Sequence, residues 1–88
     1  MTSKERAELR SQAAAADTII QIGKSGITEN VIASVDTALN ARELVKGKVL
    51  ESSMLTAREA CEQLAAALNA EPIQAIGTKF VLYRKKPD

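Results

Sequence analysis

The sequence contains no histidine and only one cysteine, Cys61, among 88 residues. Zinc sites built from histidine and cysteine, and the nucleophile–base pairs of Ser-His and Cys-His enzymes, therefore cannot be assembled within this chain. A single cysteine also excludes an internal disulfide, which fits a reducing compartment. We accordingly predict a protein that is not an enzyme and has no catalytic residue, no metal site and no cofactor.

Aromatic residues and excess charge are also scarce. Phe80 and Tyr83 are the only aromatics, so the core must be aliphatic, and few side chains are available on which nucleic-acid bases could stack. Twelve basic and eleven acidic residues give a net charge of +1. A protein that coats nucleic acid non-specifically would be strongly basic, so any nucleic-acid binding here must depend on where the charges lie.

The beginning of the chain, MTSKERAELR, carries charges of both signs and no apolar run. It therefore resembles neither a signal peptide nor a membrane span. We expect a cytoplasmic protein that has no contact with a membrane.

Hydrophobic periodicity predicts seven elements in one domain, which spans residues 1–88 and has its core between about 3 and 84. The elements are a helix over 3–16, a strand over 18–22, a helix from Thr28 to about Ala41, a strand over 43–51, a helix from Thr56 to about Asn69, and hairpin strands over 73–76 and 79–84. This order, α-β-α-β-α-β-β, predicts a single compact α/β domain in which a four-stranded mixed sheet packs with three helices.

Helix starts are the clearest local signals. Thr2 with Glu5, and Thr56 with Glu59, have the spacing of capping boxes, and Thr28 is a favourable N-cap.

Two strands carry distinct burial patterns. The near-continuous apolar run TIIQI, residues 18–22, predicts a strand that is buried on both faces. The strand over 43–51 alternates, which predicts Val45, Gly47 and Val49 on a buried face, and Lys46 and Lys48 side by side in water.

The segment QIGKSG, residues 21–26, contains a Gly-Lys-Ser that could end a nucleotide-binding P-loop. That motif needs a glycine five residues before Gly23, and Thr18 stands there instead. Without it, the wide loop whose amides wrap a β-phosphate cannot form. The sequence therefore predicts no nucleotide binding.

The same segment is also a Gly-x-x-Gly, between a predicted strand and a predicted helix. Amides at the helix start, the positive end of the helix dipole and the cation of Lys24 would all favour a phosphate there. Two glycines would let the backbone approach such a ligand closely. From these four residues alone, a plain strand-to-helix turn with a solvated lysine explains the segment better than a phosphate site does.

The remaining candidate residues have plain structural explanations. Cys61 lies on the apolar face of its helix and is expected in the core. Ser25 lacks both the spacing of a nucleophile elbow and a base. The charged side chains could be a solvated strand face and a soluble tail: Lys46, Lys48, Arg84, Lys85 and Lys86.

Four segments occur in an order and spacing typical of one family: TSKERAELR, IIQIGKSGITENV, ARELVKGKVLE and IQAIGTKFVLYR. Together they run from about Ser3 to Arg84 and resemble the CRM domain, named for chloroplast RNA splicing and ribosome maturation, in its free-standing, bacterial YhbY-like form. The most specific parts are the segment from Gly23 to Asn30 and the ending IG-x-x-x-VLYR.

The resemblance implies a fold similar to the C-terminal domain of translation initiation factor three. It also implies binding to structured RNA, with the GxxG loop on the RNA backbone, and a role with ribosomal RNA in precursors of the large ribosomal subunit. The resemblance places Arg10 on a basic position of the first helix. The candidate RNA-binding residues are Gly23, Lys24, Ser25, Gly26, Thr28, Arg10, Lys46, Lys48 and Arg84.

A second function class stays open. The near-neutral charge would also suit a non-catalytic module that docks on a ribosomal protein or on itself. A continuous positive surface from Lys24 to Arg10 or Lys46 would favour RNA, whereas an exposed apolar patch would favour protein.

Overall fold

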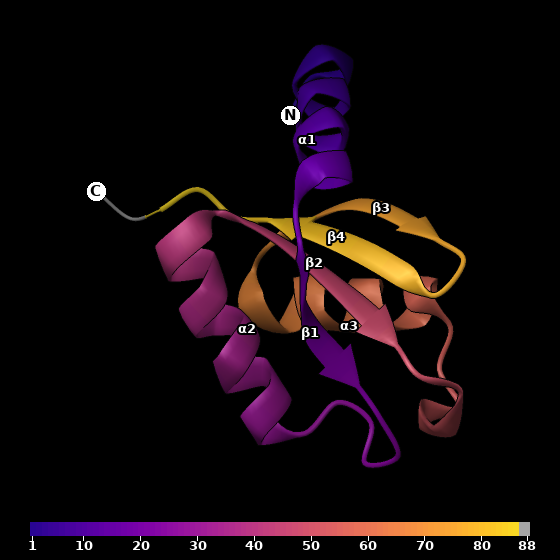
Figure 1. The fold of residues 1–88 in the computed structure, drawn as a ribbon. Helices are drawn as coiled ribbons and strands as arrows, with labels where there is room; N and C mark the ends of the chain where they lie inside the picture. Colours follow the sequence, from indigo (N-terminus) through magenta and orange to yellow (C-terminus); the bar gives the residue numbers. More distant parts are fainter. Residues whose placement is uncertain (87–88) are drawn as a thin grey trace.

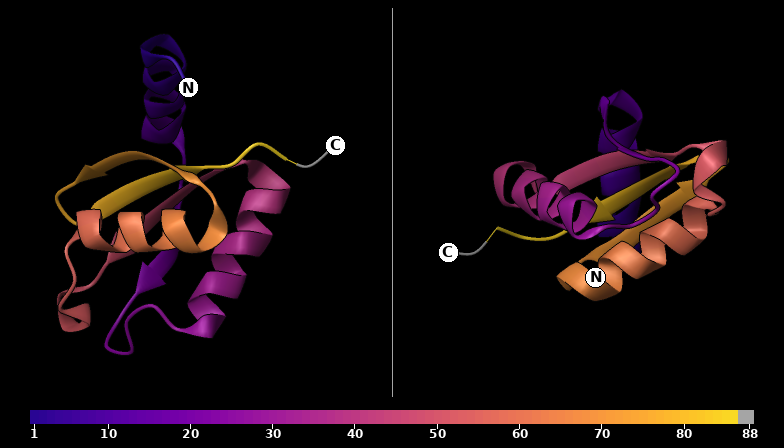
Figure 2. Two further views of the ribbon diagram at one scale, coloured as in Figure 1. Left: turned by 180° about the vertical axis from the view of Figure 1, so that it is seen from behind. Right: turned by 90° about the horizontal axis from the view of Figure 1, so that it is seen from below.

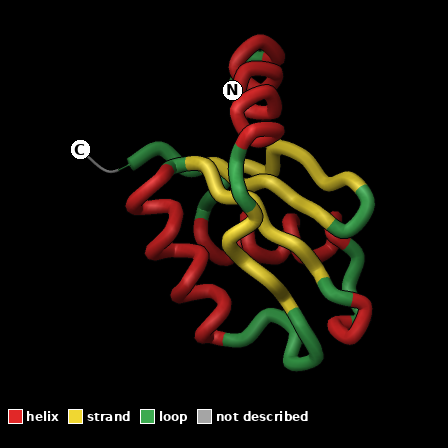
Figure 3. Tube along the Cα trace, in the orientation of Figure 1, coloured by secondary structure: helices red, strands yellow, loops and turns green. Residues whose placement is uncertain are grey.

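The computed structural model describes residues 1–86 of the chain (Figure 1). Its elements are α1 (Ser3–Ala15), β1 (Thr18–Ile22), α2 (Glu29–Arg42), β2 (Leu44–Val49), a short 3-10 turn η1 (Glu51–Ser53), α3 (Ala57–Leu68), β3 (Glu71–Ile76) and β4 (Lys79–Tyr83). The predicted order of three helices and four strands is confirmed (Figure 3). The turn η1 (Glu51–Ser53) was not predicted. The predicted strand over 43–51 extended into its first residue, whereas β2 ends at Val49.

The helix starts follow the predicted caps. The Thr28 hydroxyl accepts a hydrogen bond from the amide of Val31, 3.2 Å away. Thr56 and Glu59 form a complete capping box. At the start of α1 only half of the box forms, because the carboxylate of Glu5 accepts from the Thr2 hydroxyl rather than from the Thr2 amide.

The four strands form one mixed sheet in the order β1-β2-β4-β3. β1 and β2 are parallel and are connected through α2, whereas β4 pairs antiparallel with both β2 and β3. The parallel pair has a structural consequence. The chain leaves β1 and β2 at the same end of the sheet, so the segments after Ile22 and after Val49 are neighbours.

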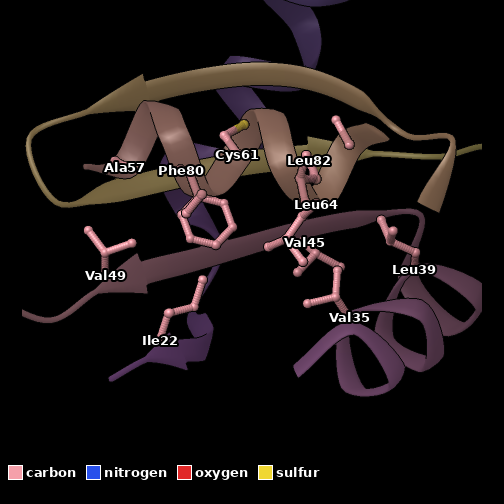
Figure 4. Packing of buried hydrophobic residues seen from close by; sticks show 12 residues of the cluster. Ile22, Val35, Leu39, Val45, Val49, Ala57, Cys61, Leu64, Phe80 and Leu82 are labelled. Atoms are coloured by element: carbon pink, nitrogen blue, oxygen red, sulfur yellow. The ribbon is translucent and has the colours of Figure 1, made fainter. Parts of the chain in front are cut away.

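Helices α2 and α3 cover one face of the sheet and enclose the main core (Figures 2 and 4). Its largest fully buried side chains come from the two central strands, the end of β1 and both helices: Phe80, Leu82, Val45, Ile22, Val35, Leu39, Leu64 and Cys61. The core is aliphatic around a single ring, as the scarcity of aromatics predicted.

Gly47 makes room for that ring. Gly47 and Phe80 are direct cross-strand partners in β2 and β4, and both face the core. A Cβ built on Gly47 would lie 2.3 Å from Cζ of Phe80, which is far inside a van der Waals contact. A glycine is therefore required at this position, because any side chain would occupy the volume of the ring.

The other face of the sheet carries α1, whose first turns stand clear of the domain (Figures 1 and 2). A small cluster holds the end of this helix to the sheet: Ala13, Ile73 and Val81, with Leu9, Leu44 and Tyr83 around them. Polar contacts reinforce it. Arg6 donates to the carbonyl of Pro72 at 2.6 Å, and Lys46 Nζ donates to the carbonyl of Ala13 at 3.2 Å.

Two predictions about strand burial need correction. Lys46 does not stand free in water beside Lys48, because α1 packs over this part of the sheet and the ammonium binds the end of that helix. β1 is not buried on both faces, because α2 packs on one face while α1, on the other, packs mainly on β2, β3 and β4. Ile22 is fully buried, whereas Ile19 on the opposite face is 38% exposed.

Candidate functional site

The segment Gly23–Gly26 forms a tight turn between β1 and α2. The amide of Gly26 donates to the carbonyl of Gly23 at 2.9 Å, which closes a four-residue turn. Lys24 and Ser25 occupy its tip and are exposed. A closed turn of this size differs from the wide loop of a nucleotide-binding P-loop, in agreement with the missing glycine at Thr18.

The two glycines of this turn have different structural needs. Gly26 has φ of +69°, a left-handed conformation that residues with a Cβ rarely adopt. Gly23 has no positive φ, and a Cβ there would lie 3.6 Å from Cδ1 of Leu50, an ordinary contact. The fold therefore requires glycine at position 26 but not at position 23. The fold would tolerate a side chain at position 23, yet glycine leaves the backbone there open to close approach by a ligand.

The start of α2 lies directly after the turn. The first bond within the helix runs from the amide of Ile32 to the carbonyl of Thr28, and the Thr28 hydroxyl accepts from Val31. The amides of Glu29 and Asn30 precede these bonds and have no partner within the helix. They add to the positive end of the helix dipole. The exposed carboxylate of Glu29 lies in the same first turn and partly offsets this charge.

A second loop lies against the glycine turn. The amide of Leu50 donates to the carbonyl of Ile22 at 2.8 Å, and a Cβ on Gly23 would lie 4.0 Å from the Ser52 hydroxyl. After η1, Met54 adopts a left-handed conformation with φ of +62° and is 89% exposed. Sequence reasoning missed this loop, because its neighbour in space is 27 or more residues away along the chain and no local pattern links them.

The predicted basic residues fall into separate groups. Lys48 belongs to β2 near the glycine turn, and its side chain lies on the open face of the sheet. Arg10 is exposed on α1, which lies at the end of the molecule opposite to the loop after β1 (Figures 1 and 2). Arg10 and Lys24 are thus not brought together. Lys46 lies between them but is engaged with α1.

Arg84 is engaged within the fold. Its guanidinium pairs with the carboxylate of Asp36 at 2.8 Å and is only 20% exposed. It also donates to the side chain of Asn40 and to the carbonyls of Leu68 and Asp36. These contacts fasten the end of β4 to α2 and α3. Because its donors are used, Arg84 has little left to offer a ligand.

Lys79 was not among the predicted residues, although it is exposed on the same sheet face as Lys48. A signal was present in the sequence. Lys79 is the first residue after the Gly77-Thr78 turn, and alternation with the buried Phe80 places it on the opposite face.

Cys61 is confirmed as a core residue, 2% exposed. Burial, with a smaller contribution from the charge of Glu62, raises the pKa of its thiol from 9.0 to about 11. A thiol that is protonated and buried is a poor nucleophile. Within residues 1–86, no group of three histidine, cysteine, aspartate or glutamate side chains is placed to hold a metal ion. No helix in that range is long and apolar enough to cross a membrane.

Comparison with known proteins agrees with this architecture. The model of the CRS1 / YhbY (CRM) domain matches residues 1–84, so the chain belongs to the CRM domain family. It is 34% identical over 88 residues to a Bacillus subtilis protein named probable RNA-binding protein YqeI. This similarity covers 100% of this chain and 92% of that protein. It is 31% identical over 84 residues to a Haemophilus influenzae protein named RNA-binding protein, with 96% and 85% covered.

A solved structure has the same fold. The solution structure of the hypothetical protein SAV1595 from Staphylococcus aureus superposes with a TM-score of 0.74 at 37% sequence identity. The similarity covers 100% of this chain and 92% of that one. The predicted family and the predicted fold class are both confirmed.

Proposed function

We propose that this protein binds RNA, and that the turn Gly23–Gly26 at the start of α2 is its principal contact with the RNA backbone. Membership of the CRM family and the names of the relatives support RNA as the partner. The observation that carries the site is Gly23, a glycine that the fold does not need, next to free helix amides and the exposed Lys24.

Binding at this site uses phosphate chemistry. The amides of the turn and of the first turn of α2 donate to phosphate oxygens, and Lys24 adds a positive charge. The ring of Phe80 is buried and Tyr83 packs beneath α1, so neither offers a platform for bases. Recognition therefore depends on RNA shape rather than on stacking. We further propose that the RNA is ribosomal RNA in precursors of the large subunit, that the protein acts in the cytoplasm as an assembly factor, and that it catalyses no reaction.

A second candidate function has some support. Ile76 is 66% exposed and Met54 is 89% exposed, and such side chains suit docking on a ribosomal protein or on a second copy of the chain. Ile76 is the last residue of β3, whereas Met54 follows η1. Analytical ultracentrifugation with and without RNA separates the two functions, because self-association without RNA would favour the docking function.

Crosslinking in cells, followed by sequencing of the attached RNA, tests the proposed target. We expect reads that concentrate in one region of large-subunit precursor RNA. In vitro, three to five phosphate contacts predict a slope of about −2 to −4.5 when the logarithm of affinity is plotted against that of salt concentration. Affinity that does not change with salt would contradict a phosphate site and would favour the protein-docking function.

A further inference from the structure

Two lysines lie directly opposite one another on the open face of the sheet. Lys48 of β2 and Lys79 of β4 are register partners. The same row continues to Gln21 of β1 on one side and to Ile76 of β3 on the other, so it crosses all four strands. Side chains in such a pair start about 4.5–5.5 Å apart, and like charges placed this way repel each other.

Within residues 1–86, no acidic side chain forms an ion pair with either lysine. The ion pairs formed there involve Arg6, Arg58 and Arg84, and none involves a lysine. The four strands carry a single acidic residue, Glu71, which lies at the other end of the sheet beside Arg6. The chain is near neutral as a whole, yet this part of its surface is positive.

Two hydrogen bonds place the lysine pair at the same end of the sheet as the glycine turn. The amide of Leu50 donates to the carbonyl of Ile22, the residue before Gly23. The amide of Val49, the residue after Lys48, donates to the carbonyl of Thr78, the residue before Lys79. The glycine turn and both lysines therefore surround the same strand ends.

We infer that Lys48 and Lys79 form a second phosphate-binding site, which holds the backbone of the same RNA as it continues from the glycine turn across the open sheet face. This inference rests on the proposed function and extends it to a second surface. A phosphate placed between two ammonium groups converts their repulsion into attraction. Because no aromatic side chain is exposed in this row, the site contacts phosphates and reads no bases.

The test compares two double variants with the same loss of charge. Lys48→Gln with Lys79→Gln removes the pair, whereas Lys85→Gln with Lys86→Gln removes two exposed charges after β4. Each is titrated with a fully paired RNA duplex of arbitrary sequence over a range of salt concentrations. Loss of the phosphate held between the two lysines should reduce the magnitude of the salt slope by about 0.9, the contribution of one neutralised phosphate, whereas the control variant should keep the slope.

Lysine acetylation followed by mass spectrometry provides a second measurement on the unaltered protein. RNA should protect Lys48 and Lys79 together with Lys24, and should leave Lys85 and Lys86 reactive. Thermal melting without RNA serves as the folding control. Removal of the repulsive pair should leave the melting temperature unchanged or slightly higher.

The outcomes separate this inference from the proposed function. Equal slopes for the two double variants, or RNA-independent acetylation of Lys48 and Lys79, would overturn the second site. If Lys24→Glu abolishes binding in that situation, the glycine turn stands alone and the proposed function survives. If the unaltered protein binds no RNA at any salt concentration, both proposals fall together.

Discussion

The sharpest test of the glycine turn replaces each of its glycines by alanine. The two positions look alike in the sequence, but their backbones differ: Gly26 has φ of +69° and Gly23 has no positive φ. The same added methyl group therefore probes the fold at one position and ligand approach at the other.

Stability should change in opposite directions. Alanine at position 26 must adopt a left-handed conformation, which costs roughly 1–2 kcal/mol. For a domain of this size, each kcal/mol lowers the melting temperature by about 4–8 °C. Alanine at position 23 meets Leu50 at an ordinary 3.6 Å and restricts the unfolded chain, so we expect a gain of about 0.4–1 kcal/mol.

RNA affinity should follow a different order. Gly23→Ala places a methyl group where a phosphate would approach the backbone, and we expect a loss on the order of tenfold, about 1.4 kcal/mol, without loss of stability. Thermal melts and RNA titrations of both variants measure the two effects separately. A Gly23→Ala variant that is stable and binds RNA as tightly as the unaltered protein would refute close approach at this glycine.

Three further predictions follow from single side chains. Lys24→Glu should weaken RNA binding by on the order of five- to 150-fold with little change in melting temperature, whereas Lys86→Glu should cost much less; equal losses would mean that only overall charge matters. Gly47→Ala should destabilise the fold by about 1–3 kcal/mol in urea unfolding, because its Cβ overlaps the ring of Phe80; an unchanged midpoint would contradict the packing of the core. Folding raises the pKa of the Cys61 thiol from 9.0 to about 11, so the unfolded chain loses this proton first as pH rises. The free energy of unfolding should therefore fall between about pH 9 and 11. A Cys61→Ala variant should lack this part of the decline.

Most of the fold could be predicted because its signals are local. The caps at Thr28 and Thr56, the alternation in β2 and the turn at Gly77 each depend on a few neighbouring residues, and all appear in the structure. The errors arose where burial depends on distant partners. TIIQI is apolar enough for a central strand, yet sheet order puts it at an edge, and no pattern within β1 records that order.

The candidate site was predictable only in part for the same reason. The glycine turn and its helix start could be read from the sequence, because they are contiguous. The separate roles of Lys46, Lys48, Lys79 and Arg84 depend on what lies opposite each of them. Lys46 meets the end of α1, Arg84 meets Asp36, and Lys48 meets Lys79. The sequence supplies a list of cations, but strand register and helix placement decide which of them remain free.

The separate packing of α1 leads us to expect that this helix is less stable than the rest of the domain. Its cluster around Ala13 lies on the opposite side of the sheet from the main core, and Arg6 and Lys46 fasten it through a few polar contacts. Release of α1 would expose only the small cluster around Ala13 and would leave the main core beneath α2 and α3 intact. Amide hydrogens of α1 should therefore exchange with solvent when this helix detaches locally. Those of β2 and β4 should exchange many times more slowly, because their exchange requires unfolding of the whole domain. A detached α1 would also free the ammonium of Lys46 beside Lys48, so the open sheet face would then present one more unengaged lysine.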